Sequence, residues 1–207
     1  MKQVIVIPAR MSGTRLPGKP LINIDGKPII EHVYNQCAKV IEKEMIYVAT
    51  EDNIIVNYCK KNNINVVNTG RASSAINRIK LFSDVIDADS YINVQGDEPI
   101  VNPLDIKSIL EYNVKYPNRV AFGKSRANFQ EFSDYSKAKV VCSLSGRLLY
   151  SSRAGIPMNN KGDYVSAERA IWIYAFNKKN LKKYFDTTNK RKLEHLEDNE
   201  IIGFLEI

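Results

Sequence analysis

The sequence predicts an α/β protein with a doubly wound, mostly parallel sheet. In the first half of the chain, short apolar segments of strand length alternate with segments whose apolar residues recur at helical spacing. This alternation implies parallel strands joined by helices through right-handed crossovers. The first strand is followed by a loop of glycine, hydroxyl and basic residues, which is where open α/β sheets bind ligands. The length of 207 residues fits a single domain.

In the first half, strands are predicted where apolar residues lie between turn signals. The predicted strands cover residues 4–7, a short piece at 22–24 closed by the Asp25-Gly26 turn, 45–49, 64–67 and 90–94. The predicted helices run from Pro28 to about Val40, from Thr50 as N-cap through Lys60, over 73–85 with Ile76, Ile79, Phe82 and Val85 inward, and over 104–114.

The second half is less regular, and residues 120–176 are predicted to contain a β-rich part within the single domain of residues 1–207. Its predicted strands are 119–125, a hairpin of 138–142 and 147–151 around Ser145-Gly146, and 170–177. Two helices are predicted near the end of the chain, at 178–184 and 193–204.

Composition indicates an ordinary soluble protein, with 44% hydrophobic and 26% charged residues. We expect no membrane partner, because no apolar run is long enough to span a bilayer and the N-terminus does not read as a signal peptide. Three widely spaced cysteines, Cys37, Cys59 and Cys142, indicate a reducing compartment, so a cytoplasmic location is expected. The net charge of +7 would permit nucleic-acid binding, but no nucleic-acid motif accompanies it, and no nucleic-acid partner is expected.

The loop after the first strand predicts a polyphosphate site. It carries three cations, Arg10, Arg15 and Lys19, among glycine and hydroxyl residues that include Ser12, Gly13 and Thr14. Glycine lets backbone N–H groups approach an anion, lysine supplies a point charge and arginine a fork of donors. The alternative interpretation is a basic turn that only keeps the protein soluble.

A second informative stretch follows the strand at 90–94, and it reads Gln95-Gly96-Asp97-Glu98-Pro99. In a doubly wound sheet this strand should neighbour the first one, so Asp97 would face the polyphosphate loop. Nucleotide-bound Mg²⁺ takes one or two carboxylates besides phosphate oxygens, so Asp97 suits a metal ligand. The alternative is a turn closed by an Asx-type bond.

Together these stretches resemble the signatures of the 3-deoxy-manno-octulosonate (Kdo) cytidylyltransferases, also called CMP-Kdo synthetases. The segments 8–10 and 14–21 resemble the opening signature of that family, and 93–99 is similar to its second signature. Further matches, which extend the resemblance over essentially the whole chain, lie at 48–50, 138–141, 152–157 and 193–197.

The resemblance implies a sugar-nucleotide transferase fold with a small β-rich insertion that helps a homodimer to form. It also implies a reaction in which CTP and an acidic, Kdo-like sugar give a CMP-sugar and pyrophosphate, with Mg²⁺ as cofactor. The implied setting is surface polysaccharide biosynthesis, of lipopolysaccharide or capsule.

The resemblance further implies roles for individual residues. Arg15, Lys19 and Asp97 would be catalytic, and Asp97 would hold Mg²⁺ against the α-phosphate. Gln95, Arg153 and His195 would face the acceptor. The nucleotide would be bound by Pro8, Ala9, Arg10, Ser12, Gly13, Thr14, Arg15, Lys19, Ser74 and Arg78.

Three departures from the family pattern bear, in turn, on the base of the nucleotide, on the acceptor and on a second metal ligand. The segment 71–78 lacks the histidine and the Gly-Thr pair of the family, Ala170 stands where the family has a histidine, and the sequence stops at Ile207 without a Val-Asp-x-Pro-like motif. The resulting hypothesis is a divergent, C-terminally short member whose acceptor is another sugar acid or a phosphonate. The rival hypotheses are a non-catalytic nucleotide-binding relative and a transferase that uses UTP or ATP.

Overall fold

The computed structural model describes residues 1–13, 16–187 and 191–207. These residues divide into two compact units. The first consists of Met1–Ala121 and Trp172–Leu181, and the second of Phe122–Ile171 and Lys182–Ile207. The single domain spanning residues 1–207 stays a prediction.

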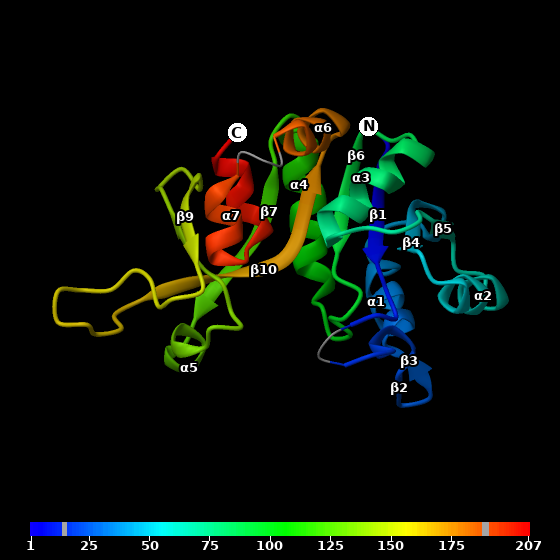
Figure 1. The fold of residues 1–207 in the computed structure, drawn as a ribbon, viewed down its shortest axis with the longest axis horizontal. Helices are drawn as coiled ribbons and strands as arrows, with labels where there is room; N and C mark the ends of the chain where they lie inside the picture. The colour runs from blue at the N-terminus through cyan, green and yellow to red at the C-terminus, as the bar shows by residue number, and fades with distance from the viewer. Residues whose placement is uncertain (14–15, 188–190) are drawn as a thin grey trace. The chain divides into compact units, whose positions relative to one another are not determined.

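The first unit is built on a sheet in the order β5-β4-β1-β6-β10. The strands are β1 (Gln3–Pro8), β4 (Ile46–Thr50), β5 (Val66–Asn68), β6 (Ser90–Val94) and β10 (Ala167–Phe176). β1 lies between β4 and β6 and pairs with both in parallel, and β4 pairs with β5 in parallel (Figure 1). β10 joins β6 antiparallel through residues 173–176. The predicted parallel arrangement is therefore confirmed for the first half of the chain.

Helices cover both faces of this sheet. They are α1 (Ile29–Cys37), α2 (Asn53–Lys61), α3 (Ala75–Val85) and α4 (Pro103–Lys115). On one face, the Phe82 ring of α3 packs against Tyr47 and Tyr91, with centroid distances of 5.4 and 6.2 Å. Tyr91 pairs with Val4 in the register, so both side chains lie on the face that α3 covers. Gln3, the residue before Val4, points to the opposite face. There Gln3 donates from Nε2 to the Leu110 carbonyl of α4 at 3.1 Å, so the sheet is doubly wound as predicted.

Smaller elements complete the first unit. The hairpin β2 (Asn23–Ile24) and β3 (Lys27–Pro28) turns at Asp25-Gly26, as predicted. Two short 3₁₀ helices, η1 (Lys19–Leu21) and η2 (Lys43–Met45), precede α1 and β4. Cys37 and Cys59 are fully buried and pack as small apolar residues of the core.

Two local predictions in this unit are wrong. Val85 was expected to face inward but is 61% exposed, because it is the last residue of α3 and the chain continues extended through the half-buried Ile86. Thr50 was expected to cap α2, but Asp52 is the N-cap residue. Thr50 ends β4, and its Oγ1 accepts the Asp52 N–H at 3.0 Å.

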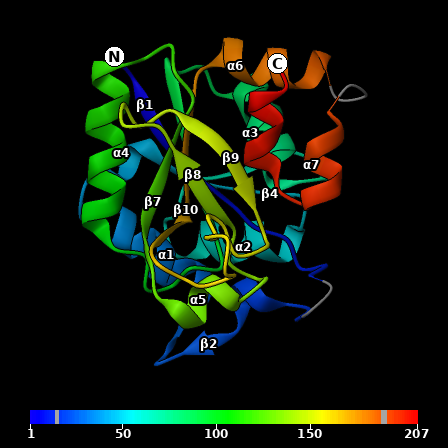
Figure 2. The ribbon, with the colours of Figure 1, turned by 90° about the vertical axis from the view of Figure 1, so that its left-hand side faces the viewer.

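The second unit contains the predicted β-rich part. Its strands are β7 (Ala121–Ala127), β8 (Lys139–Cys142), β9 (Leu148–Ser152) and the first part of β10. β8 pairs antiparallel with both β9 and β10, and β7 also pairs with β10, so the predicted hairpin is confirmed (Figure 2). α5 (Phe129–Ser133) follows β7 and begins with a capping box between Asn128 and Glu131.

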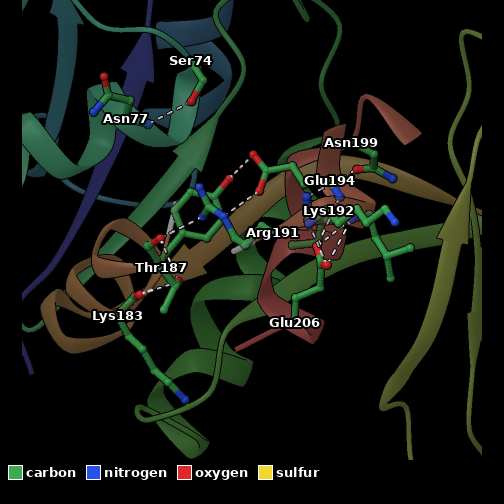
Figure 3. A network of polar contacts seen from close by, with 12 residues as sticks. Ser74, Asn77, Lys183, Thr187, Arg191, Lys192, Glu194, Asn199 and Glu206 are labelled. Atoms are coloured by element: carbon green, nitrogen blue, oxygen red, sulfur yellow. Dashed lines mark hydrogen bonds and ion pairs between the residues drawn. The ribbon is translucent and has the colours of Figure 1, made fainter. Parts of the chain in front are cut away.

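The end of the chain forms α6 (Lys178–Asp186), α7 (Lys192–Glu197) and the 3₁₀ helix η4 (Glu200–Leu205). The predicted continuous helix over 193–204 is wrong, because Asp198 adopts φ 45° and Asn199 is extended. The Asn199 side chain caps η4 and donates from Nδ2 to Ser151 Oγ at 2.7 Å, which fixes the break. Glu206 folds back and accepts backbone N–H groups of Lys192, Leu193 and Glu194 (Figure 3).

In the part of the chain that the structure describes, no helix is both long enough and apolar enough to cross a membrane.

Two substitutions on α3 test this packing. Replacing the fully buried Phe82 with alanine removes a ring that contacts two tyrosines, and should lower the free energy of unfolding by about 3–5 kcal/mol. Val85→Ala, three residues later on the same helix, should change it by less than about 0.5 kcal/mol because the side chain is exposed. Urea unfolding of both variants measures the contrast, and equal losses would contradict this placement of α3.

Candidate active site

The charged loops predicted from the sequence meet at one edge of the first unit. β1, β4 and β6 run parallel, so their carboxyl ends lie at the same edge of the sheet. The loop of Arg10 follows β1, Glu51 and Asp52 follow β4, and Asp97 follows β6.

Gly96 controls how closely the first and last of these loops approach. A Cβ atom added there would lie 2.4 Å from the backbone oxygen of Pro8, a distance that real Cβ atoms essentially never show. Glycine is therefore required for the ends of β6 and β1 to come this close. Asp97 is the next residue, so the same contact brings its carboxylate beside the loop after β1.

Lys19 and Asp97 form an ion pair across this edge. Lys19 Nζ lies 2.8 Å from Asp97 Oδ2, and the two side chains are 37% and 47% exposed. Gly18, just before Lys19, adopts φ 73°, which starts η1 and sets the direction of the chain at the lysine. An ion pair this exposed is worth about 0.2–1 kcal/mol, so a ligand can separate it at small cost.

Backbone hydrogen bonds shape the loop itself. The Ala9 N–H donates to the Ala49 carbonyl at 2.9 Å, which extends the contact of β1 with β4. The Met11 N–H donates to Asp52 Oδ2 at 2.7 Å, and the Met11 carbonyl accepts the Gly18 N–H at 2.9 Å.

The structure places the predicted loop residues as follows. Pro8 and Ala9 are buried, Gly13 is half-buried, and Arg10 and Ser12 are exposed. The predictions for Thr14 and Arg15 fall outside the described residues.

The two predicted nucleotide-binding residues of α3 have structural partners. Ser74 is the N-cap residue, and its Oγ accepts the Asn77 N–H at 3.2 Å (Figure 3). Arg78 is only 2% exposed, and its Nη1 donates to Thr69 Oγ1 at 2.9 Å and to the Gly70 carbonyl at 3.1 Å. The Arg78 guanidinium is therefore embedded beneath this edge of the sheet.

Three further charged side chains act on the Arg78 guanidinium, those of Glu51, Asp52 and Arg10. Arg78 Nη2 lies 3.6 Å from Glu51 Oε2. Burial lowers the pKa of Arg78, the carboxylates of Glu51 and Asp52 act in the opposite direction, and the Arg10 charge adds to the lowering. Charges of both signs therefore gather here: Glu51 and Asp52 follow β4, and the Arg78 guanidinium reaches the loop after β5.

Sequence reasoning missed Asp52 and Asn93. Asp52 was assigned only to a helix start, although it follows a parallel strand as Asp97 does, and that shared position was the available signal. Asn93 is fully buried on β6, and neither atom of its amide has a hydrogen-bond partner within the described residues. The available signal for Asn93 was its polar amide between the apolar residues Ile92 and Val94 of a buried strand.

The donor set at this edge suits a metal that arrives with its own ligands. Within residues 1–13, 16–187 and 191–207, no group of three or more histidine, cysteine, aspartate or glutamate side chains is placed to hold a metal ion. Asp97 offers an accessible carboxylate. It pairs with Lys19, and a ligand can separate this exposed pair at small cost. A single carboxylate combined with phosphate oxygens fits nucleotide-bound Mg²⁺.

Two predicted acceptor residues belong to the second unit. The Arg153 guanidinium donates to the carbonyls of Asp198, at 2.6 Å, and of Tyr135, at 3.2 Å, and so binds the backbone at the end of α7. Its backbone N–H donates to the Glu197 carboxylate at 3.2 Å. His195 is exposed on α7.

A pair of substitutions tests the contact at Gly96. Gly96→Ala forces a methyl group against the Pro8 backbone and should lower the free energy of unfolding by about 1–3 kcal/mol. Asp97→Ala, at the adjacent position, loses only an exposed ion pair and should cost less than about 1 kcal/mol. If denaturant unfolding gave Gly96→Ala the smaller loss, the close approach of β1 and β6 would be refuted.

Comparison with known proteins identifies the family. A 3-deoxy-manno-octulosonate cytidylyltransferase 2 from Hydrogenovibrio crunogenus is 34% identical over 97% of this chain and 83% of its own length. An 8-amino-3,8-dideoxy-manno-octulosonate cytidylyltransferase from Shewanella halifaxensis is also 34% identical, with the same coverage.

Solved structures agree with these relatives. The structure of a CMP:2-keto-3-deoxy-manno-octonic acid synthetase complexed with CTP superposes with a TM-score of 0.92 at 32% identity, covering 99% of this chain and 86% of that one. This likeness confirms the predicted α/β fold class. A family model described as cytidylyltransferase matches residues 4–204. The chain therefore belongs to the cytidylyltransferase family of nucleotidyltransferase enzymes.

Proposed function

We propose that the protein transfers CMP from CTP to an acidic sugar of the 3-deoxy-manno-octulosonate type and releases pyrophosphate. The observation that carries this proposal is the exposed Lys19–Asp97 pair beside the loop after β1. It offers one group for a phosphate and one for a metal ion at a single point. The relatives named for Kdo and for its 8-amino analogue support the acceptor class, and the CTP complex of the synthetase supports the nucleotide.

In this proposal the loop after β1 holds the triphosphate. Arg10 and Lys19 neutralise phosphate oxygens, and Arg15 is assigned the same role from its sequence motif. The backbone and small side chains of the loop and the start of α3 contribute the remaining nucleotide contacts, through Pro8, Ala9, Ser12, Gly13, Thr14 and Ser74. Because Arg78 is buried, we assign it an indirect role in which it holds Thr69 and Gly70 in place.

Asp97 is the proposed ligand of Mg²⁺. Lys19 would give up the Asp97 carboxylate for a phosphate oxygen, and Asp97 would be the residue that holds the metal ion, which would supply charge neutralisation at the phosphates. Both groups remain charge-paired through the exchange, so the cost of opening their exposed pair is recovered.

The transfer itself needs positioning and charge neutralisation more than covalent help. An acceptor hydroxyl oxygen forms a bond to the α-phosphorus, and the bond from that phosphorus to the bridging oxygen breaks. Pyrophosphate leaves with that electron pair, and the hydroxyl proton passes to water. Lys19 stabilises the leaving pyrophosphate because its positive charge offsets the charge that develops there.

The remaining assignments stay predictions. They are the acceptor contacts of Gln95, Arg153 and His195, the homodimer, the cytoplasmic location and the place in surface polysaccharide biosynthesis.

Pyrophosphate release with a substrate panel tests the proposal. The panel combines CTP, UTP or ATP and Mg²⁺ with Kdo, its 8-amino analogue, other sugar acids and a phosphonate. We expect release with CTP and an acidic sugar, abolished by EDTA. Asp97→Asn should reduce the rate about 100-fold or more, because the anionic group that would hold Mg²⁺ against the phosphates is lost.

The matched control is Asp84→Asn. Asp84 also pairs with a lysine, Lys80, at 2.5 Å in an exposed position, but it lies near the C-terminal end of α3 and not at the carboxyl ends of the strands, so its loss should leave the rate unchanged. CTP binding without release on any acceptor would instead identify a non-catalytic relative. Release with the phosphonate alone would replace the proposed acceptor class.

A further inference from the structure

We infer that Asp52 is a positioning residue that holds the loop after β1 in the shape that binds the polyphosphate. This inference rests on the proposed function for its consequence, whereas the contact on which it depends is a hydrogen bond within the protein itself.

Asp52 fixes the loop at the peptide group before Met11. Its Oδ2 accepts the Met11 N–H at 2.7 Å, while the carbonyl of the same residue accepts the Gly18 N–H at 2.9 Å. The second bond closes the loop on itself between residues 11 and 18, and the first bond ties the closed loop to the end of β4. Arg10 and Lys19 flank these two tied points, so the spacing of both cations depends on them.

The carboxylate makes this bond in place of a local one. Asp52 is the N-cap residue of α2, where an aspartate side chain usually accepts an N–H of the first helical turn. Here the side chain makes no capping bond, although the Asp52 carbonyl accepts the N–H groups of Ile55 and Val56 at 3.0 and 3.1 Å in the usual way. Instead, its Oδ2 accepts the N–H of Met11, a residue 41 positions earlier in the chain.

The backbone that carries Asp52 is itself fixed. Thr50 is fully buried, its carbonyl accepts the Thr69 N–H at 2.8 Å, and its Oγ1 accepts the Asp52 N–H at 3.0 Å. Arg78 holds the neighbouring segment through Thr69 and Glu51. Asp52 therefore connects the loop after β1 to a backbone that is itself held by buried hydrogen bonds.

The charge of Asp52 also suits this position. Arg10 and the buried Arg78 are close enough that each charge opposes the other, and Asp52 and Glu51 offset that repulsion. An uncharged residue at 52 would leave two cations less compensated, as well as leaving the Met11 N–H without its acceptor.

Three variants and two measurements test the inference. We expect Asp52→Ala to exchange its Met11 amide hydrogen at least about tenfold faster by NMR, and to bind CTP about tenfold more weakly by calorimetry, because a charge-assisted bond is lost. Asp52→Asn keeps a carbonyl oxygen as acceptor but loses the charge, so its effects on both properties should be smaller than those of Asp52→Ala. The circular dichroism and thermal unfolding of each variant are recorded to confirm that α2 and the fold persist.

The matched control is Asp89→Ala. Asp89 accepts the Lys2 N–H at 2.6 Å, so it makes the same kind of carboxylate–backbone bond at the opposite end of β1. Its loss should change neither Met11 exchange nor CTP affinity. A response equal to that of Asp52→Ala would mean that any loosened end of β1 suffices, and would overturn the inference.

Two other outcomes would overturn it. Unchanged Met11 exchange in Asp52→Ala would show that the bond does not hold the loop. Faster exchange with unchanged CTP affinity would show that the held shape does not serve binding. If the unmodified protein bound no CTP, the proposed function would fail, and the exchange measurement alone would decide whether Asp52 anchors the loop.

Discussion

The parallel pairing of β1 with β4 on one side and β6 on the other is the constraint on which the candidate site depends. The register sets Pro8 beside Ala49 and Val6 beside Asn93, so the three chains leave the sheet at neighbouring points. Groups that are 78 residues apart in sequence, Lys19 and Asp97, then meet at 2.8 Å. The absence of a side chain at Gly96 completes the approach, since any Cβ atom would strike the Pro8 carbonyl.

The charged side chains at this edge fall into a buried group and an exposed group, and the two differ in what they bind. Arg78 is nearly inaccessible and bonds to protein oxygens, so removing its partners would leave a buried charge uncompensated. Lys19 and Asp97 are more than one-third exposed and neutralise each other only weakly. Asp52 lies between these cases, half-buried and bonded to the loop. The buried group fixes the backbone, and the exposed pair stays available to a ligand.

The sequence predicted those elements whose signals are local. β6 runs over residues 90–94 as expected, because the strand formers Tyr91, Ile92 and Val94 come directly before the turn residues Gln95-Gly96. The helix predicted over 193–204 failed because its break depends on a distant partner, the Ser151 hydroxyl that holds Asn199. Lys19 and Asp97 were found because their residue types follow strands. Asp52 was missed because an aspartate at the start of a helix is expected to cap that helix. The hydrogen bond from the Met11 N–H to its carboxylate appears only in the folded structure.

The same distinction applies to the arginines that the motifs selected. A motif fixes which residue stands at a position, but an arginine has five donors and the fold decides which of them are committed. Arg78 commits its guanidinium to Thr69, Gly70 and Glu51, whereas Arg153 reaches carbonyls at the end of α7 with its side chain still 31% exposed. A carboxylate ligand could reach Arg153 only in competition with those carbonyls, and could reach Arg78 only by unpacking α3. The backbone at Asp198 therefore fixes the Arg153 guanidinium, and under the proposed assignment of Arg153 to the acceptor, the geometry of the end of α7 would be part of that contact.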